Sequence, residues 1–127
     1  MSETLTIVLK LPARILSPNC MVGSIGGRFM KAAATKKLRR LTKEAVESED
    51  IQTAPWGFVT VYPTFYHATK RRRDEDNHQG MLKAAYDGIV DAGLIADDDS
   101  KHMSKQPPTF LTDKVNPRVD LLLVRDR

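Results

Sequence analysis

The spacing of apolar residues along this chain changes between two periods, and that change limits the folds it can adopt. Residues Thr4–Leu11 alternate between apolar and polar side chains, as a strand with one buried face does. A second such run covers about Trp56–Tyr66, and the last covers Arg118–Val124. Between them lie two stretches with helical spacing, Lys31–Ser48 and about His78–Ala92. The order strand, helix, strand, helix, strand predicts an α/β (α+β) sandwich, a small mixed β-sheet with two main helices packed on it.

The connections between these elements carry further signals. Residues 13–30 contain Pro18 and three glycines, which predict a long loop and therefore a candidate binding loop. Pro63 predicts that the far end of the second strand lies at a sheet edge or a bulge. Residues 100–117 contain three prolines, so we expect irregular structure there or one short strand.

Length and composition predict a single domain over residues 1–127, large enough to bury one core. The hydrophobic share of 41% and the charged share of 28% are typical of soluble globular proteins. The first residues lack a signal-peptide layout, and no apolar run is long enough to span a bilayer. Cys20 is the only cysteine, which excludes an intrachain disulfide and a cysteine-based zinc site. We therefore expect a protein of the reducing cytoplasm with no membrane partner.

The net charge of +4 conceals an uneven distribution along the chain. Residues 1–73 hold thirteen Lys and Arg against five Asp and Glu, whereas residues 74–127 hold seven against eleven. A sequence pI near 9.3 with the positive charge gathered in one half favours a polyanionic partner such as DNA. An ordinary solvated surface would give the same composition, so the charge alone does not decide between them.

The most unusual stretch joins a basic run to alternating acids, and a second acidic cluster follows the second helix. The first is Arg71-Arg72-Arg73-Asp74-Glu75-Asp76-Asn77, and the second is Asp97-Asp98-Asp99. If the chain stays extended through residues 70–76, Asp74 and Asp76 point to the same side. Such carboxylates repel one another unless a cation lies between them, and arginines beside them suit a phosphodiester. Helix capping is the simpler explanation for Asp76, with Gln79 completing a capping box or Asn77 as the alternative cap.

Hard oxygen ligands favour Mg²⁺ over zinc, with Mn²⁺ as a substitute. We expect one or two such ions, held by Asp74, Asp76 and Asp98, to assist hydrolysis of a phosphodiester bond. The arginines of the basic run would bind neighbouring phosphates without reading sequence. The basic side of the first helix and the glycine-rich stretch before it are further candidates for DNA contact, or else simply a solvated surface. These DNA-binding candidates are Arg71, Arg72, Arg73, Arg28, Lys36, Lys37 and Arg40.

Other reactive residue types do not form recognisable motifs. His67, His78 and His102 are too scattered for a zinc motif, and each is more typical of a surface residue, although His78 is a minor candidate for a phosphate contact. The glycines at 23–27 are not followed by Gly-Lys-Ser/Thr, so the sequence predicts no nucleotide cofactor. Cys20 has no partner that indicates nucleophilic use.

Three motifs in order give the chain a resemblance to a known family. The run Arg71–Asn77 is followed by Lys83-Ala84-Ala85-Tyr86-Asp87 and then by the stretch from Asp91 to Asp98. Together they resemble the RusA family of Holliday junction resolvases, which is common in phages and prophages. The well-matched part covers about 30 residues, and the N-terminal strand matches the family more loosely. Each motif is weak by itself, but three in sequence within one small basic domain are fairly specific.

The resemblance implies a RusA-like fold and a homodimeric, Mg²⁺-dependent endonuclease. It would bind four-way DNA junctions during recombination and repair and resolve them by paired, symmetric nicks, in the cytoplasm of a bacterial host. The family's catalytic carboxylates carry over to Asp74, Asp76 and Asp98, and its essential lysine carries over to Lys83. Asp97 or Asp99 could replace Asp98, and about three additional residues precede Lys83 here. Lys83 would stabilise charge in the transition state or steer the scissile phosphate.

Two other functions fit the sequence. One is a related nuclease that cuts flaps or other branched DNA, and the other is a non-catalytic phage DNA-binding protein. A resolvase needs two active sites at a fixed separation, which a two-fold dimer provides. The last strand and residues 100–117 are the candidate dimer surfaces.

Overall fold

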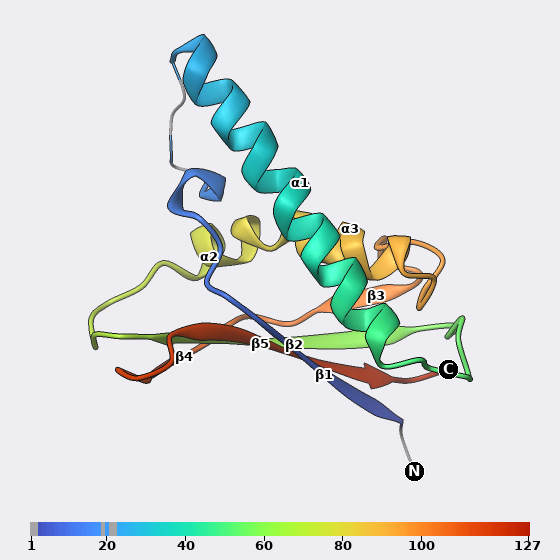
Figure 1. The fold of residues 1–127 in the computed structure, drawn as a ribbon. Coiled ribbons are helices and arrows are strands. Elements are labelled where there is room, and N and C mark those ends of the chain that lie inside the picture. Colours follow the sequence, from blue (N-terminus) through green and yellow to red (C-terminus); the bar gives the residue numbers. More distant parts are fainter. Residues whose placement is uncertain (1–2, 19, 21–22) are drawn as a thin grey trace.

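The structure is a computed structural model that describes residues 3–18, 20 and 23–127. Within these residues five strands form one mixed sheet, and the helices lie on one of its faces (Figure 1). The strands are β1 (Thr4–Leu9), β2 (Val59–His67), β3 (Met103–Lys105), β4 (Thr109–Thr112) and β5 (Arg118–Arg125). The helices are η1 (Arg14–Leu16, a 3-10 helix), α1 (Ile25–Ser48), α2 (Glu75–Met81) and α3 (Lys83–Asp91). The predicted class, a mixed sheet covered by helices, is confirmed.

The sheet is built around β5 and β2, which both have partners on their two sides. The strand order is β1-β5-β2-β3, and β4 also pairs with β2. β5 runs antiparallel to β1 and to β2, whereas β3 and β4 run parallel to β2. The chain enters the parallel strands from the helical layer, because a parallel connection needs a long crossover.

Pro63 lies inside the sheet, so the prediction that it marks an edge or a bulge was wrong. It pairs with Leu121 of β5. On the other side of β2, the backbone N–H of Gln106 donates to the Val61 carbonyl at 2.9 Å. Continuing that parallel register, the position of Pro63 would face the Gln106 carbonyl, and proline has no N–H to donate. The ladder is therefore interrupted there, and the partner edge is divided into β3 and β4.

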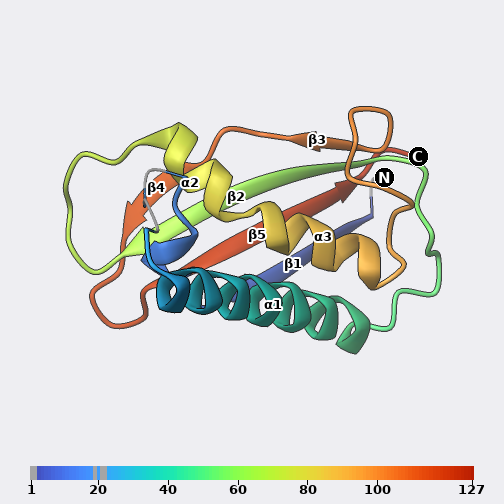
Figure 2. The same cartoon turned by 90° about the horizontal axis from the view of Figure 1, so that it is seen from above.

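The core lies between the sheet and the helices. Alternate residues of β1, β2 and β5 point into it, as the predicted period of two requires. Figure 2 shows α1 above the β1 side of the sheet and α3 above its middle. The largest fully buried side chains are those of Trp56, Phe65, Ile7, Leu82, Ile89, Leu94, Ile95, Leu121, Leu123, Val59, Val61 and Val119.

α1 and α3 pack closely, and a glycine permits that contact. A Cβ added at Gly88 would lie 2.5 Å from the Arg39 carbonyl oxygen and 2.8 Å from Cβ of Thr42. Thr42 is fully buried, and its hydroxyl donates to the Leu38 carbonyl at 2.8 Å. At the rim of the same contact, Arg39 forms a two-pronged ion pair with Asp91, at 2.5 and 2.8 Å. The basic face of α1 is thus partly used to attach α1 to α3.

Two predicted helix starts were wrong. α1 begins at Ile25, six residues before the expected start, so the predicted loop over 13–30 is shorter; residues 19, 21 and 22 of it lie outside the described residues. Ser24 explains the early start, because its hydroxyl accepts from the Gly27 N–H at 3.0 Å and caps the helix. The second predicted helix is divided at Leu82 into α2 and α3, and it begins at Glu75 rather than near His78.

Other predicted boundaries also needed correction. β2 begins at Val59 instead of Trp56, because Trp56 forms an isolated parallel bridge with Ile95. Residues 100–117 contain two short strands, β3 and β4, where at most one was expected. β1 and β5 lie within one or two residues of their predicted spans.

One face of the sheet and one end of α1 have no neighbours among the described elements. In Figure 1 the helices lie above the sheet, and the first turns of α1 extend beyond it. Four apolar side chains of the open sheet face are exposed, those of Val8, Tyr62, Leu111 and Leu122. No helix in the described ranges is both long enough and apolar enough to cross a lipid bilayer.

Replacing Gly88 with alanine should lower the free energy of unfolding by roughly 1–3 kcal/mol, because the new methyl group would press α3 away from α1. The matched control is Gly26→Ala, where a Cβ meets no described atom within 4 Å. Urea denaturation of both variants checks this. Equal stability of the two would contradict the assigned contact.

Candidate functional site

Asp74 is the residue that starts α2. Its carboxylate accepts from the backbone N–H of Asn77 at 3.1 Å, so it caps the helix. Its carbonyl oxygen accepts from Nδ1 of His78 at 2.8 Å. The predicted caps, Asp76 and Asn77, are therefore wrong, and Gln79 does not complete a capping box. Capping is a sufficient structural reason for one acid at this position.

Asp76 lies in the first turn of α2 and is exposed. The prediction that Asp74 and Asp76 share one side of an extended segment was wrong, because the chain is already helical from Glu75. In a helix, residues two apart do not face the same way. A negative charge in the first turn is still favourable, since the N-terminal end of a helix carries partial positive charge.

Asp98 lies between α3 and β3 and faces two lysines. Its Oδ2 accepts from Nζ of Lys83 at 2.7 Å and from Nζ of Lys105 at 3.3 Å. The side chain of Asp98 is only 14% exposed. The hydrogen bond from Lys83 lowers the pKa of Asp98, and the same bond raises the pKa of Lys83. Lys83 also donates to Asp87 at 3.0 Å, so this lysine is held by two carboxylates.

The neighbours of Asp98 have local roles instead. Asp97 accepts from the backbone N–H of Asp98 at 2.7 Å. Asp99 accepts from Lys101 N–H at 3.0 Å and contacts Nδ1 of His102 at 2.6 Å. Of the three acids in this cluster, Asp98 is therefore the one that contacts Lys83. This favours Asp98 over Asp97 and Asp99 as the acid that pairs with the motif Lys83–Asp87.

A polar network connects α2, α3 and β3 behind this pair. The Tyr86 hydroxyl donates to the Gln79 side-chain oxygen, and Nε2 of Gln79 donates to the Gln106 carbonyl at 2.9 Å. Pro63 has no N–H and cannot donate a hydrogen bond to that carbonyl. Lys105 lies 5.1 Å from the centre of the Tyr86 ring. Burial raises the pKa of Tyr86, so its hydroxyl stays protonated as a donor.

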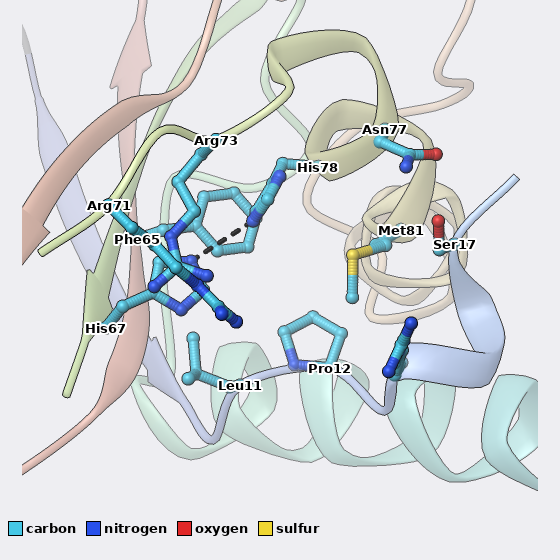
Figure 3. A pocket seen from close by; sticks show the side chains of 11 residues that line it. Leu11, Pro12, Ser17, Phe65, His67, Arg71, Arg73, Asn77, His78 and Met81 are labelled. Carbon is cyan, nitrogen blue, oxygen red and sulfur yellow. Dashed lines mark hydrogen bonds between the residues drawn. The ribbon is translucent and has the colours of Figure 1, made fainter. Parts of the chain in front are cut away.

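A cavity of about 500 Å³ lies between η1, the end of β2 and α2. Figure 3 shows His67 and His78 side by side, with Arg71 and Arg73 next to them. The two imidazoles meet at 3.1 Å between their Nε2 atoms. The prediction that these histidines are scattered surface residues was wrong, because the turn after β2 brings them together and both are half-buried. Burial, and after it the nearby charges of Arg73, His78 and Arg71, lower the pKa of His67 to about 4.

The remaining basic candidates are spread over two regions. Arg71 and Arg73 line the cavity, and Arg73 donates to the Thr69 carbonyl at 3.0 Å. Arg72 is exposed and does not line it. On α1, Arg40 pairs with Glu44 at 3.1 Å. Arg28, Lys36 and Lys37 are exposed along the same helix.

The sequence patterns did not indicate Arg14 or Lys105 as site residues, and they gave Gln79 a role only in capping. Arg14 lines the cavity from η1, Lys105 contacts Asp98 from β3, and Gln79 bridges α2 to the chain after β3. Each depends on a contact between segments far apart in sequence. Pro63 was the one usable signal, because a proline in a central strand predicts that a carbonyl on the neighbouring strand needs another donor.

The expected Mg²⁺ ion can be compared with this arrangement. The oxygen donors of Asp74, Asp76 and Asp98 are chemically suited to a hard cation. Across residues 3–18, 20 and 23–127, however, no group of three or more His, Cys, Asp or Glu side chains lies close enough together to hold a metal ion. Asp74 lies at the start of α2, whereas Asp98 contacts Lys83 at the start of α3, and the seven residues of α2 lie between these two helix starts. As arranged, the three aspartates do not form one cation site.

No protein-family model matches this chain, and no curated protein matches it. The resemblance to the RusA family therefore stays a prediction based on the three motifs.

His67 should make the stability of the protein depend on pH. Its pKa of about 4 lies below its ordinary value of 6.5, so between these values the unfolded chain binds more protons than the folded one. Stability should therefore fall as the pH falls from about 6.5 towards 4. Thermal unfolding of the unaltered protein and of His67→Gln, followed from pH 8 to pH 4.5, checks this. The variant should lose less stability over that range, and equal losses would contradict the assignment.

Proposed function

We propose that this chain is an endonuclease that cuts four-way DNA junctions by paired nicks, as its resemblance to the RusA family implies. The observation that carries the proposal is the contact between Lys83 and Asp98 at 2.7 Å. This contact joins the third motif to the second, and the second begins directly after α2, which the first motif starts. The Lys83–Asp98 contact therefore brings the third motif beside the second, and α2 connects the second to the first.

The charge distribution supports DNA as the substrate. Arg71, Arg72 and Arg73 precede α2 as one basic strap, and phosphate contacts from such residues give affinity without sequence reading. Lys83 lies at the start of α3, where Asp87 and Asp98 balance its charge. In our proposal the arginines hold the phosphate backbone while Lys83 steers the scissile phosphate or stabilises transition-state charge.

Mg²⁺, with Mn²⁺ as a substitute, remains the proposed cofactor on the chemistry of the three carboxylates. As arranged, these three side chains do not form one cation site. The proposed setting is the cytoplasm of a bacterial host.

A second candidate is a non-catalytic protein that binds branched DNA. The observation that favours it is that both key acids already have structural roles. Asp74 caps α2, and Asp98 balances the charges of two lysines. The two candidates differ in whether the negative charge of Asp74 is needed for anything besides capping.

The variant Asp74→Asn separates the two candidates, because asparagine caps a helix about as well as aspartate does. If the protein is a nuclease, this variant and Asp98→Asn should cut a mobile four-way junction at least about 100-fold more slowly while binding it normally. Cleavage is measured on the junction, a flap and a linear duplex, with and without Mg²⁺. Glu75→Gln, the neighbouring exposed acid, is the matched control and should leave the rate unchanged.

Each other outcome has a defined meaning. Cleavage of the flap alone would assign the protein to flap processing, and equal cleavage of all three substrates would contradict junction specificity. Binding of the junction without cleavage by the unaltered protein would favour the non-catalytic candidate.

We propose that the protein dimerises through the open face of its sheet. Both edges of β5 are already paired, so β5 can contribute only that face. Leu122, which is 38% exposed, lies between Thr6 of β1 and Tyr62 of β2 in the register of the sheet. Val115, which is 93% exposed, represents the other candidate surface, residues 100–117.

Light scattering after size exclusion should give a dimer at micromolar concentration for the unaltered protein and for Val115→Glu. Leu122→Glu should give a monomer, because a charge on an apolar contact face opposes association. Loss of the dimer in Val115→Glu alone would move the interface to residues 100–117. A monomeric unaltered protein would contradict paired cleavage by a stable dimer.

A further inference from the structure

The cavity beside α2 has an apolar side and a basic side. Leu11 and Pro12, which follow β1, form part of the apolar side together with Met81 of α2. Figure 3 shows the pair of imidazoles, His67 and His78, across the space from Leu11 and Pro12. At about 500 Å³ the cavity is within the usual size range of small-molecule sites.

The basic side of the cavity has no acidic counterpart. Arg14, Arg71 and Arg73 line the cavity, and the described lining of the cavity includes no carboxylate. Within the part of the chain that the structure describes, none of these three arginines forms an ion pair with Asp or Glu. Burial and the adjacent charge of Arg71 lower the pKa of Arg73, because these two cations lie close enough to repel each other. Such a cluster is poised to bind an anion.

We propose that this cavity receives one unpaired nucleotide of the DNA, with its base between Leu11–Pro12 and the two histidines and its phosphate on Arg71 and Arg73. The inference rests on the proposed function only in taking DNA as the ligand. It adds a site separate from Asp74, Asp76, Asp98 and Lys83, none of which lines the cavity.

The chemistry of the walls favours a nucleotide over a simple anion. A phosphate ion would use the arginines and leave the apolar wall without a partner. A base has flat faces that stack on aromatic rings and apolar side chains whatever its identity. His67 is neutral near pH 7, so its ring can take part in such stacking without adding charge.

A second hollow adjoins the cavity, where the next nucleotide of a bound DNA strand would lie. It has a volume of about 480 Å³ and shares His67, Arg71 and Arg73 with the first. Lys70 and Phe110 contribute to its other side. The two arginines therefore lie between two hollows, as expected if the phosphate between adjacent nucleotides crosses them. An extrahelical or unpaired nucleotide can enter, whereas a base inside an intact duplex cannot.

The test compares three fluorescein-labelled duplexes by anisotropy, in EDTA so that no cleavage occurs. The first contains one extrahelical nucleotide, the second has an abasic residue at that position, and the third is fully paired. The unaltered protein should bind the first about 5-fold to 150-fold more tightly than the second, since stacking of one base contributes about 1–3 kcal/mol. The abasic duplex keeps the phosphate, so this ratio measures the base alone.

Two sets of variants locate the effect. Pro12→Trp fills the cavity without changing charge and should reduce the ratio to about one, with its folding checked by thermal unfolding. Arg71→Ala and Arg72→Ala each remove one charge from the same strap, but only Arg71 lines the cavity. Arg71→Ala should therefore weaken binding of the extrahelical duplex more than Arg72→Ala does.

The outcomes keep this inference distinct from the proposed function. Binding to all three duplexes with equal affinity would overturn the nucleotide site while leaving DNA binding intact. Equal losses in Arg71→Ala and Arg72→Ala would also overturn it, because diffuse electrostatics would then account for the affinity. No binding to any duplex or to a four-way junction would overturn both.

Discussion

The missing N–H of Pro63 is the constraint on which the functional half of this structure depends. Because Pro63 lies in a central strand, the parallel edge of β2 is interrupted, and the carbonyl of Gln106 needs another donor. Gln79 supplies that donor at 2.9 Å, and this contact holds α2 against the sheet edge. The position of α2 in turn fixes Asp74 at its start and one wall of the cavity. A backbone defect in the sheet therefore sets the place of the candidate site.

The acids of the two clusters also show how carboxylate charge is balanced without a shared cation. The sequence places them in two groups whose mutual repulsion suggests a bound cation, but the described structure balances them one at a time. Asp74 lies at the partly positive end of a helix, Asp98 faces two lysines, and Asp99 contacts His102. Three of these acids are thus balanced by local partners and not by one shared ion. This is why the role of their charge has to be measured in variants that preserve each local contact.

The fold class could be predicted from the sequence because the burial alternation of β1, β2 and β5 and the apolar stripes of the helices are local signals. The errors came from contacts that local patterns do not contain. Ser24 started α1 early through one hydrogen bond, and Asp74 started α2 before the expected residue. At the site, the Lys83–Asp98 contact also joins segments far apart in sequence, and no local pattern predicted it. The meeting of His67 with His78 depends on the turn after β2, so spacing in sequence could not reveal it.

α2 has only seven residues, and a helix of that length is not stable by itself in water. Its position therefore depends on what it touches: the Asp74 cap at its start, the contact between His67 and His78 at its side, and the Gln79 bridge near its end. Two of these three contacts involve residues next to the cavity. A nucleotide bound there would stabilise the helix by mass action, since it would favour the state in which α2 is formed. Occupation of the cavity and the placement of Asp74 would then be coupled through one short helix, which gives the proposed nucleotide site a physical route to the proposed reaction.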